Sequence, residues 1–204
     1  RNPGEQFNPD RTVGEMLREV VRVASISGED PIDKDWSDYF YRVGIVEPER
    51  LLPKVLGELP DLTLRRLGLM RALMTHSKMI VLDHVVCALD RIAAEQFYEL
   101  IRQLRDETGM AVLLFTGTLQ GVEKFADRAA VLFDGGMLEI GDSESVIERP
   151  TFSYSRELLA CSPRLTRGAG QLPLISREAI EEAEAQVHRA QSIGLLPRQE
   201  SEEA

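Results

Sequence analysis

The pattern of apolar and polar positions changes character near Lys78. Before that point apolar residues recur at helical spacing, which predicts helices at 12–25, 31–43, 47–56 and 62–75. Thr12 and Glu15 have the spacing of a capping box at the first helix, and Pro53 predicts an irregularity in the third. The first part of the chain is therefore expected to be helical and to contain no strand.

After Lys78, three runs rich in β-branched and aliphatic residues predict buried strands: "MIVLD", "MAVLLFT" and "AAVLFD". Helices predicted at 90–107 and 119–126 separate them, which is the order typical of a parallel α/β sheet. "DGG" at 134–136 is a tight-turn signal that leads into "MLEIG", so a hairpin-like edge is expected. The predicted fold class is α/β with a mainly parallel sheet, a helical subdomain and a C-terminal helical extension.

The C-terminal part is expected to add helices near 142–148 and 153–161, then a linker at 162–174 that contains Pro and Gly. "SREAIEEAEAQVHRAQ" predicts a charged helix, and the final "PRQESEEA" has a disorder-prone composition. The acidic stretch 177–185 has two interpretations, a solvated helix face or an appended interaction helix.

Composition narrows the class of protein. The chain has 204 residues, 43% of them apolar, and a net charge of −10, which argues against nucleic-acid binding. No apolar run approaches the roughly 20 residues of a transmembrane helix, and no signal peptide opens the chain. Cys87 and Cys161 make no disulfide framework, so a reducing cytoplasm is expected. The chain opens with Arg1 rather than Met, which suggests a fragment or a processed product.

The end of the first predicted strand carries candidate chemistry. Asp83 would stand at the sheet edge, where α/β folds place functional residues, and His84 comes directly after it. His84 could be a neutral hydrogen-bonding residue, a substitute catalytic residue or a metal ligand, although no second His or Cys stands at ligand spacing. Asp90 could cap the next helix regardless of function.

The order of these segments resembles the later two-thirds of an ABC-transporter ATPase domain, most closely the peptide-importer type. "FNPDRTVGEML" is similar to the stretch after the Q-loop, "ELPDLTLRRLGLMRAL" to the signature motif and its helix, "MIVLDH" to Walker B and "CALD" to the D-loop. "MAVLLFTGT" is similar to the switch-histidine strand, and "ADRAAVLFDGGMLEIGDSESVIERPTFSYSRELL" to the closing strands and helices.

The resemblance implies a domain organisation. Residues 1–161 would form an ABC ATPase-like domain without its N-terminal part, with a helical subdomain at about 12–75 and an α/β part at about 76–161. Residues 162–204 would be a linker, a charged helix and an acidic tail. The aromatic cluster of Trp36, Tyr39, Phe40 and Tyr41 would be core or would line the groove that receives a permease helix.

The resemblance also implies ATP and Mg²⁺ as cofactors, in a site built from two subunits. Asp83 matches the Walker B aspartate, which would hold Mg²⁺ through water, and Asp90 matches a D-loop position near the nucleotide. No G-x-x-x-x-G-K-[ST] phosphate loop, the Walker A motif, occurs in the sequence. In the family that loop lies upstream of the Q-loop.

Several positions depart from the family pattern. His84 stands at the Walker B glutamate position and brings no carboxylate, and Gly117 stands at the switch-histidine position without a side chain. The Q-loop glutamine position falls at Arg1. The signature-motif positions run from Leu59 to Thr63: Pro60, Asp61 and Leu62 stand in place of the serine and two glycines, and Thr63 stands at the following Gln or Met position. A carboxylate there would repel a phosphate.

These departures predict a degenerate ABC-transporter ATP-binding subunit with weak or absent hydrolysis. It would be a docking or regulatory component, peripheral on the cytoplasmic face of the cell membrane, with a permease and a second ABC ATPase subunit as partners. One alternative is a functional transport ATPase whose Walker A region lies upstream. The other is a stand-alone scaffold that has kept the fold and left transport.

Overall fold

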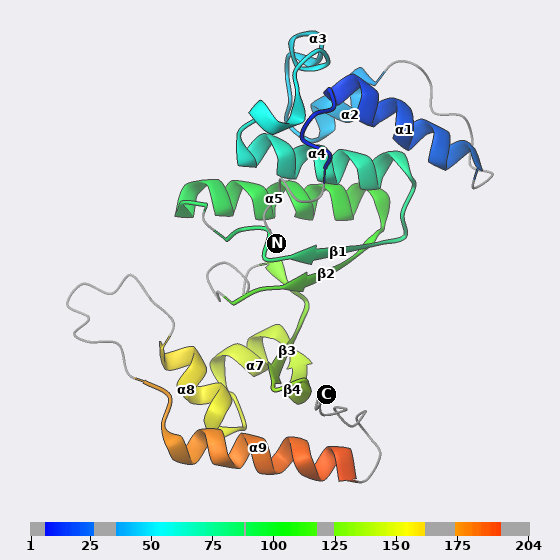
Figure 1. The fold of residues 1–204 in the computed structure, drawn as a ribbon. Coiled ribbons are helices and arrows are strands. Elements are labelled where there is room, and N and C mark those ends of the chain that lie inside the picture. Colours follow the sequence, from blue (N-terminus) through cyan, green and yellow to red (C-terminus); the bar gives the residue numbers. More distant parts are fainter. Residues whose placement is uncertain (1–6, 27–35, 88, 118–124, 162–173, 193–204) are drawn as a thin grey trace. The chain divides into compact units, whose positions relative to one another are not determined.

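The computed structural model describes residues 7–26, 36–87, 89–117, 125–161 and 174–192. The chain divides into two compact units, Arg1–Gly117 and Thr118–Ala204, and each is described by itself. Together they contain helices and short strands, which confirms the α/β class (Figure 1). None of the described helices is long and apolar enough to cross a membrane.

The first unit is mainly helical before Lys78, as the sequence predicted. Its helices are α1 (Val13–Ile26), α2 (Ser37–Arg42), α3 (Pro48–Leu51), the 3-10 turn η2 (Leu56–Glu58), α4 (Asp61–Met74) and α5 (Arg91–Thr108). The predicted helices at 12–25, 62–75 and 90–107 are confirmed as α1, α4 and α5. Of the helix predicted at 31–43, the part up to residue 35 lies outside the described residues, and α2 forms the rest.

The capping box at the start of α1 is formed. The backbone N–H of Thr12 donates to Oε2 of Glu15 at 2.8 Å, and the N–H of Glu15 donates to Oγ1 of Thr12 at 3.2 Å. The bond from the Thr12 backbone is the main cause that holds the pKa of Glu15 below its ordinary value. Two residue types at the right spacing therefore fix where the first helix begins.

The prediction of a helix at 47–56 was wrong in its length: the observed helix α3 is shorter and ends at Leu51. Pro53 comes two residues later, and a proline lacks the N–H that a continuing helix needs. The next residues instead bond to the start of the chain: the N–H of Leu56 donates to the carbonyl of Arg11 at 2.8 Å. Thr12 and Val55 form an isolated antiparallel bridge, so the segment around Val55 pairs with the residues at the start of α1.

Helix α4 is the centre of the helical core. It contacts both α1 and α2, and it buries side chains on several faces: Leu64, Leu67, Leu69, Met70, Leu73 and Met74. Phe40 of α2 is fully buried, as expected for a core aromatic residue, whereas Tyr41 is 55% exposed. A helix that is apolar on several faces needs cover from several sides, and α1 and α2 provide part of it.

The α/β part of the first unit is one β–α–β element. Strands β1 (Met79–Asp83) and β2 (Ala111–Phe115) pair in parallel, in a register that runs from Met79 opposite Ala111 to Asp83 opposite Phe115. Helix α5 connects them, and its residues Phe97 and Ile101 are buried. Figure 1 shows α4 and α5 on one side of this pair.

The second unit contains an antiparallel hairpin of β3 (Arg128–Phe133) and β4 (Gly136–Asp142). Asp134 and Gly135 have φ values of 44° and 72°, as a tight turn between strands requires, so the "DGG" signal is confirmed. A single sheet with this hairpin at its edge was predicted, but the described strands form two separate sheets of two strands. Apolar strand patterns alone do not say which strands pair.

Three helices complete the second unit: α7 (Ser143–Glu148), α8 (Ser153–Cys161) and α9 (Arg177–Ser192). All three were predicted, whereas the helix expected at 119–126 falls mostly outside the described residues. Ala183 and Val187 of α9 are buried against Leu138 of β4, with Phe133 and Tyr154 packed on the cluster. The charged helix thus has an apolar face that belongs to the core of its unit, and its acidic face is the outer one.

Candidate functional site

The turn after β1 is held in an unusual backbone conformation. His84 has φ of 50°, in the left-handed region that few non-glycine residues adopt. Its N–H donates to the carbonyl of Phe115 at the end of β2 (2.9 Å), and its own carbonyl accepts from the N–H of Cys87 (3.0 Å). These two bonds fix the place of His84 at the carboxyl end of the parallel pair, where α/β proteins hold their ligands.

Asp83 and His84 form a side-chain pair at this strand end. Nδ1 of His84 lies 2.7 Å from Oδ1 of Asp83, and both side chains are about half exposed. An ionised carboxylate only accepts hydrogen bonds, so Nδ1 must be the donor. In the neutral imidazole Nε2 then carries the free lone pair, which makes it an acceptor for a water or another donor.

Gly117 lies beside the His84 ring. A Cβ atom built at Gly117 would stand 3.9 Å from Nε2 of His84, which is ordinary contact distance. The structure therefore brings together two positions that the sequence linked only through the family resemblance. The imidazole from position 84 stands next to the space that a side chain at position 117 would enter.

Asp90 acts as the N-cap of α5. Its Oδ1 accepts from the N–H of Ala93 at 2.9 Å, and its backbone is extended, as at a regular helix start. The capping interpretation is thus observed. The nucleotide-binding role of Asp90 stays a prediction.

The signature-motif positions, residues 59–63, form the start of α4. Pro60 is the N-cap, and its carbonyl accepts from the N–H groups of Thr63 (2.9 Å) and Leu64 (3.1 Å). Asp61 is the first helical residue and places a carboxylate in the first turn. A negative charge there is favourable for the helix dipole, and it occupies the region where an anion would otherwise be attracted.

Arg65, one turn further along α4, joins this helix to the turn after His84. It donates to the backbone carbonyls of Val85 and Cys87, the latter at 2.9 Å. Burial lowers the pKa of Arg65 despite the nearby Asp61 carboxylate. Arg65 was not predicted from the sequence, since an arginine on a helix gives no signal that its partners are loop carbonyls twenty residues away.

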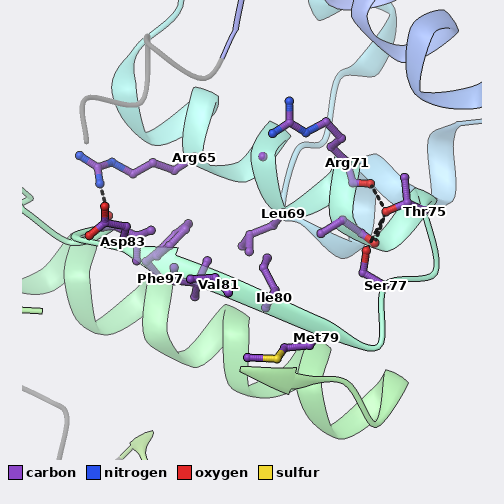
Figure 2. Close-up of a pocket in the computed structure, with 14 residues that line it drawn as sticks. Arg65, Leu69, Arg71, Thr75, Ser77, Met79, Ile80, Val81, Asp83 and Phe97 are labelled. Atoms are coloured by element: carbon purple, nitrogen blue, oxygen red, sulfur yellow. Dashed lines mark hydrogen bonds between the residues drawn. The ribbon is translucent and has the colours of Figure 1, made fainter. Parts of the chain in front are cut away.

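A cavity of about 540 Å³ lies between α4 and β1 (Figure 2). Its wall is made by α4, by all five residues of β1 and by Phe97 of α5; the α4 residues are Arg65, Gly68, Leu69, Arg71 and Ala72. At one end of the cavity the hydroxyl of Thr75 donates to the carbonyl of Arg71 and lies 2.9 Å from the hydroxyl of Ser77. Asp83 is at the other end, so the cavity leads to the candidate site (Figure 2).

Asp83 is the residue that the sequence analysis assigned to a metal ion. Within the described ranges, no group of three or more His, Cys, Asp or Glu side chains could hold a metal ion. The role of Asp83 toward Mg²⁺ stays a prediction, and one of its oxygens already accepts from His84. Arg1, at the Q-loop glutamine position, lies outside the described residues.

Sequence comparison relates the chain to ATP-binding proteins of transport systems. No family model matches it. It is 32% identical over 165 residues to the peptidoglycan transport ATP-binding protein YejF of Agrobacterium fabrum, covering 80% of this chain and 30% of that protein. It is 27% identical over 194 residues to the glutathione import ATP-binding protein GsiA of Salmonella choleraesuis, covering 93% and 31%. The chain thus spans less than a third of the length of these relatives.

Solved structures with a similar fold are also transporter ATPases. CbiO1 of Clostridium perfringens, part of the ABC transporter complex CbiONQ, matches with a TM-score of 0.58 at 19% identity, over 72% of this chain and 57% of that chain. MJ1267, an ATP-binding cassette of an ABC transporter, in its ADP conformation matches with a TM-score of 0.51 at 20% identity, over 70% and 58%. At these identities the likeness shows the fold.

Proposed function

We propose that this chain, a homologue of ABC-transporter ATP-binding proteins with the fold of their ATPase domain, is a degenerate ATP-binding subunit of an importer. Its role is to dock or regulate within the transport complex, with weak or absent ATP hydrolysis. The relatives are named for peptidoglycan transport and for glutathione import, which supports a transport complex as the setting.

The observation that carries the proposal is the Asp83–His84 pair. Asp83 stands at the Walker B aspartate position, and its Oδ1 is bound to the imidazole at 2.7 Å. A glutamate at position 84 would offer a carboxylate to orient water, whereas His84 turns Nδ1 toward Asp83. Because Nδ1 of His84 and Oδ1 of Asp83 bond to each other, both atoms are less available to a metal-bound water or a nucleotide.

Two further positions weaken a nucleotide site. Gly117 offers no side chain to a phosphate, although the His84 ring stands close to it. At the start of α4, Asp61 places a negative charge in the first helical turn, where a partner's phosphate would need a positive field. Both a nucleotide held by this subunit and one held by a partner would meet unfavourable groups.

The proposed partners are a transmembrane permease and a second ABC-type ATPase subunit, with this chain peripheral on the inner face of the membrane. ATP and Mg²⁺ are the cofactors of such a site. Asp83 would hold the metal through water, in competition with His84.

One observation favours the alternative of a working ATPase. Nε2 of His84 is free to accept from a water when Asp83 holds Nδ1–H, which is how a carboxylate prepares an imidazole to act as a base. In that case His84 would take over water orientation.

The experiment that separates these functions compares wild type with His84→Ala in the complex purified from membranes. We expect the permease to co-purify with both forms and Mg-ATP turnover to be the same in both. Loss of turnover in His84→Ala alone would show a working ATPase. Purification of the wild type without any permease would instead support the scaffold alternative.

A further inference from the structure

The turn after β1 is held partly by its own backbone and partly by helix α4. The carbonyl of His84 accepts from the N–H of Cys87 at 3.0 Å, which is a bond within the turn. The carbonyls of Val85 and Cys87 accept instead from the guanidinium of Arg65, the second of them at 2.9 Å. Two of the bonds that shape this turn therefore come from another element of the unit.

The shape of an arginine side chain suits this contact. Nη1 of Arg65 donates to the carbonyl of Val85 and Nη2 to that of Cys87, so one planar group holds both acceptors at a fixed separation. A lysine, with a single ammonium on a flexible chain, cannot fix that separation in the same way. Figure 2 shows the Arg65 side chain reaching from α4 toward the end of β1 that carries Asp83.

This contact is unfavourable for the arginine itself. Arg65 is half-buried, and burial is the main cause that lowers the pKa of its guanidinium. Its Nε atom is buried as well and has no hydrogen-bond partner among the described residues. Two neutral carbonyls offset only part of the loss of water around a charge. An apolar side chain would avoid this loss, which favours a role for Arg65 in fixing the turn.

The turn also carries the imidazole of the candidate site. His84 comes directly before Val85, has φ of 50°, and places Nδ1 2.7 Å from Oδ1 of Asp83. A positive φ at such a residue persists only where the surrounding contacts hold it. The bond from the N–H of His84 to the carbonyl of Phe115 holds it from one side, and Arg65 holds the residues that come next. The orientation of the ring toward Asp83 therefore depends on Arg65.

The charge of Arg65 is in turn supported by Asp61. The two residues are four positions apart on α4, and the Asp61 carboxylate favours the charged guanidinium against the effect of burial. Asp61 is exposed, so a cationic group from outside can approach it. Neutralising Asp61 removes this support and weakens the hold of Arg65 on the turn.

We propose that Arg65 is a positioning residue that links the exposed carboxylate of Asp61 to the imidazole of His84. It holds the turn after β1, and the turn keeps Nδ1–H of His84 on Asp83. A cationic side chain of a partner that binds Asp61 changes the orientation of His84 through this link. The proposal deepens the proposed function, because it rests on the Asp83–His84 pair and names a way in which a partner regulates it.

The tautomer of His84 tests the role of Arg65. The full chain has three histidines, so the imidazole signals in long-range ¹⁵N–¹H spectra can be assigned with His84→Gln, and His76 and His188 serve as references. Wild type should show His84 in the Nδ1–H form, because Asp83 only accepts hydrogen bonds. In Arg65→Gln we expect loss of this single form, since the ring is no longer held on Asp83. Arg65→Lys, which keeps the charge but not the fork, should restore it in part.

Arg66→Gln is the matched control. Arg66 is the next residue of α4 and also donates to a loop carbonyl, that of Gly44, so its replacement removes a similar bond elsewhere. Both glutamine variants should lower the thermal midpoint, but only Arg65→Gln should change the His84 signals. Unchanged signals in Arg65→Gln, or an equal change in Arg66→Gln, would overturn the positioning role. If Arg65→Gln does not fold, the signals of Arg65→Lys decide in the same way.

Asp61→Asn tests the other end of the link. It should shift the His84 signals in the same direction as Arg65→Gln but by less, and it should cause no further shift when combined with Arg65→Gln. An equal effect of Asp61→Asn with and without Arg65 would overturn the link. None of these spectra requires ATP turnover, so a failure here is distinct from a failure of the proposed function.

Discussion

Two strands of this protein end alike in sequence but lead into different turns. β1 ends in Asp83, and Asp134 comes directly after β3, each behind a run of apolar residues. Both strands then turn through a non-glycine residue of positive φ, His84 at 50° and Asp134 at 44°. After β3 the chain reverses at once into an antiparallel strand, whereas after β1 it enters the turn held by Arg65.

The residue after the positive φ explains the difference. Gly135 also has a positive φ of 72°, and two such residues in succession build a hairpin turn. His84 is succeeded instead by Val85 and Val86, which are nearly buried, so the chain continues into the core. The turn after β3 only joins two strands of a hairpin. The turn after β1 leaves the side chains of Asp83 and His84 half exposed, so they are accessible to a ligand.

The largest expected effect is at the hairpin end. Gly135→Val places a β-branched side chain at a φ of 72° and should lower the free energy of unfolding of the second unit by roughly 2 kcal/mol. Asp134→Gly is the control, because it relieves the positive φ at the neighbouring position. Chemical denaturation followed by circular dichroism would measure both, and an unchanged midpoint for Gly135→Val would contradict the turn geometry.

Lowering the pH should destabilise the second unit, which contains the β3–β4 hairpin, through protonation of Glu139 in β4. Burial raises the pKa of Glu139, but hydrogen bonding, chiefly from the backbone N–H of Thr151 at 2.7 Å, outweighs it, so the pKa lies below its ordinary value. A lowered folded-state pKa adds stability that is complete above the unfolded-state pKa and disappears as the pH falls through the folded-state value.

Glu139→Gln should therefore cost about 1 kcal/mol at neutral pH and should flatten the acid limb of a stability–pH curve for the second unit. Glu144, in the first turn of the next helix, offers a control carboxylate as Glu144→Gln. If Glu139→Gln kept the wild-type acid limb, the pH dependence would have another origin.

In the first unit, the substitution Asp90→Ala tests whether Asp90, at the D-loop position, stabilises the protein as a helix cap. Loss of the bond to the N–H of Ala93 should destabilise α5 and the first unit by about 1 kcal/mol. Asp90→Ser or Asp90→Asn should restore most of it, because both side chains cap helices well. A stability loss of the same size in Asp90→Asn would show that charge, and not capping, is what matters.

The smallest expected effect concerns Gly117. Gly117→Ala places a Cβ at ordinary contact distance, 3.9 Å from Nε2 of His84, and should leave the free energy of unfolding within about 0.5 kcal/mol. Gly117→Leu should displace the ring and change the imidazole NMR signals of His84. Identical His84 signals in Gly117→Leu and wild type would show that the two positions do not touch.

The sequence predicted the elements well and their pairing less well. Capping residues, turn glycines and helical spacing act locally, so α1, α4, α5 and the hairpin turn could be predicted from neighbours in the chain. Whether β3 joins β1 in one sheet depends on contacts between distant segments, which apolar runs do not encode. The core face of α9 was missed because charged residues dominate its composition.

The parts of the candidate site that depend on contacts between residues close in sequence could be predicted. The capping role of Asp90 could be predicted from its place before a helix, and the Asp83–His84 contact joins adjacent residues. The approach of Gly117 to His84 and the bonds from Arg65 to the turn carbonyls depend on how strands and helices pack. The family resemblance pointed to position 117, but nothing pointed to Arg65.

The closeness of His84 and Gly117 couples the two positions. With the imidazole in place, a large side chain at position 117 meets the ring, and with glycine at 117, removal of the ring leaves that space to solvent. The effect of a substitution at either position therefore depends on the other, which is epistasis. Substitutions at positions 84 and 117 are therefore expected to affect stability non-additively.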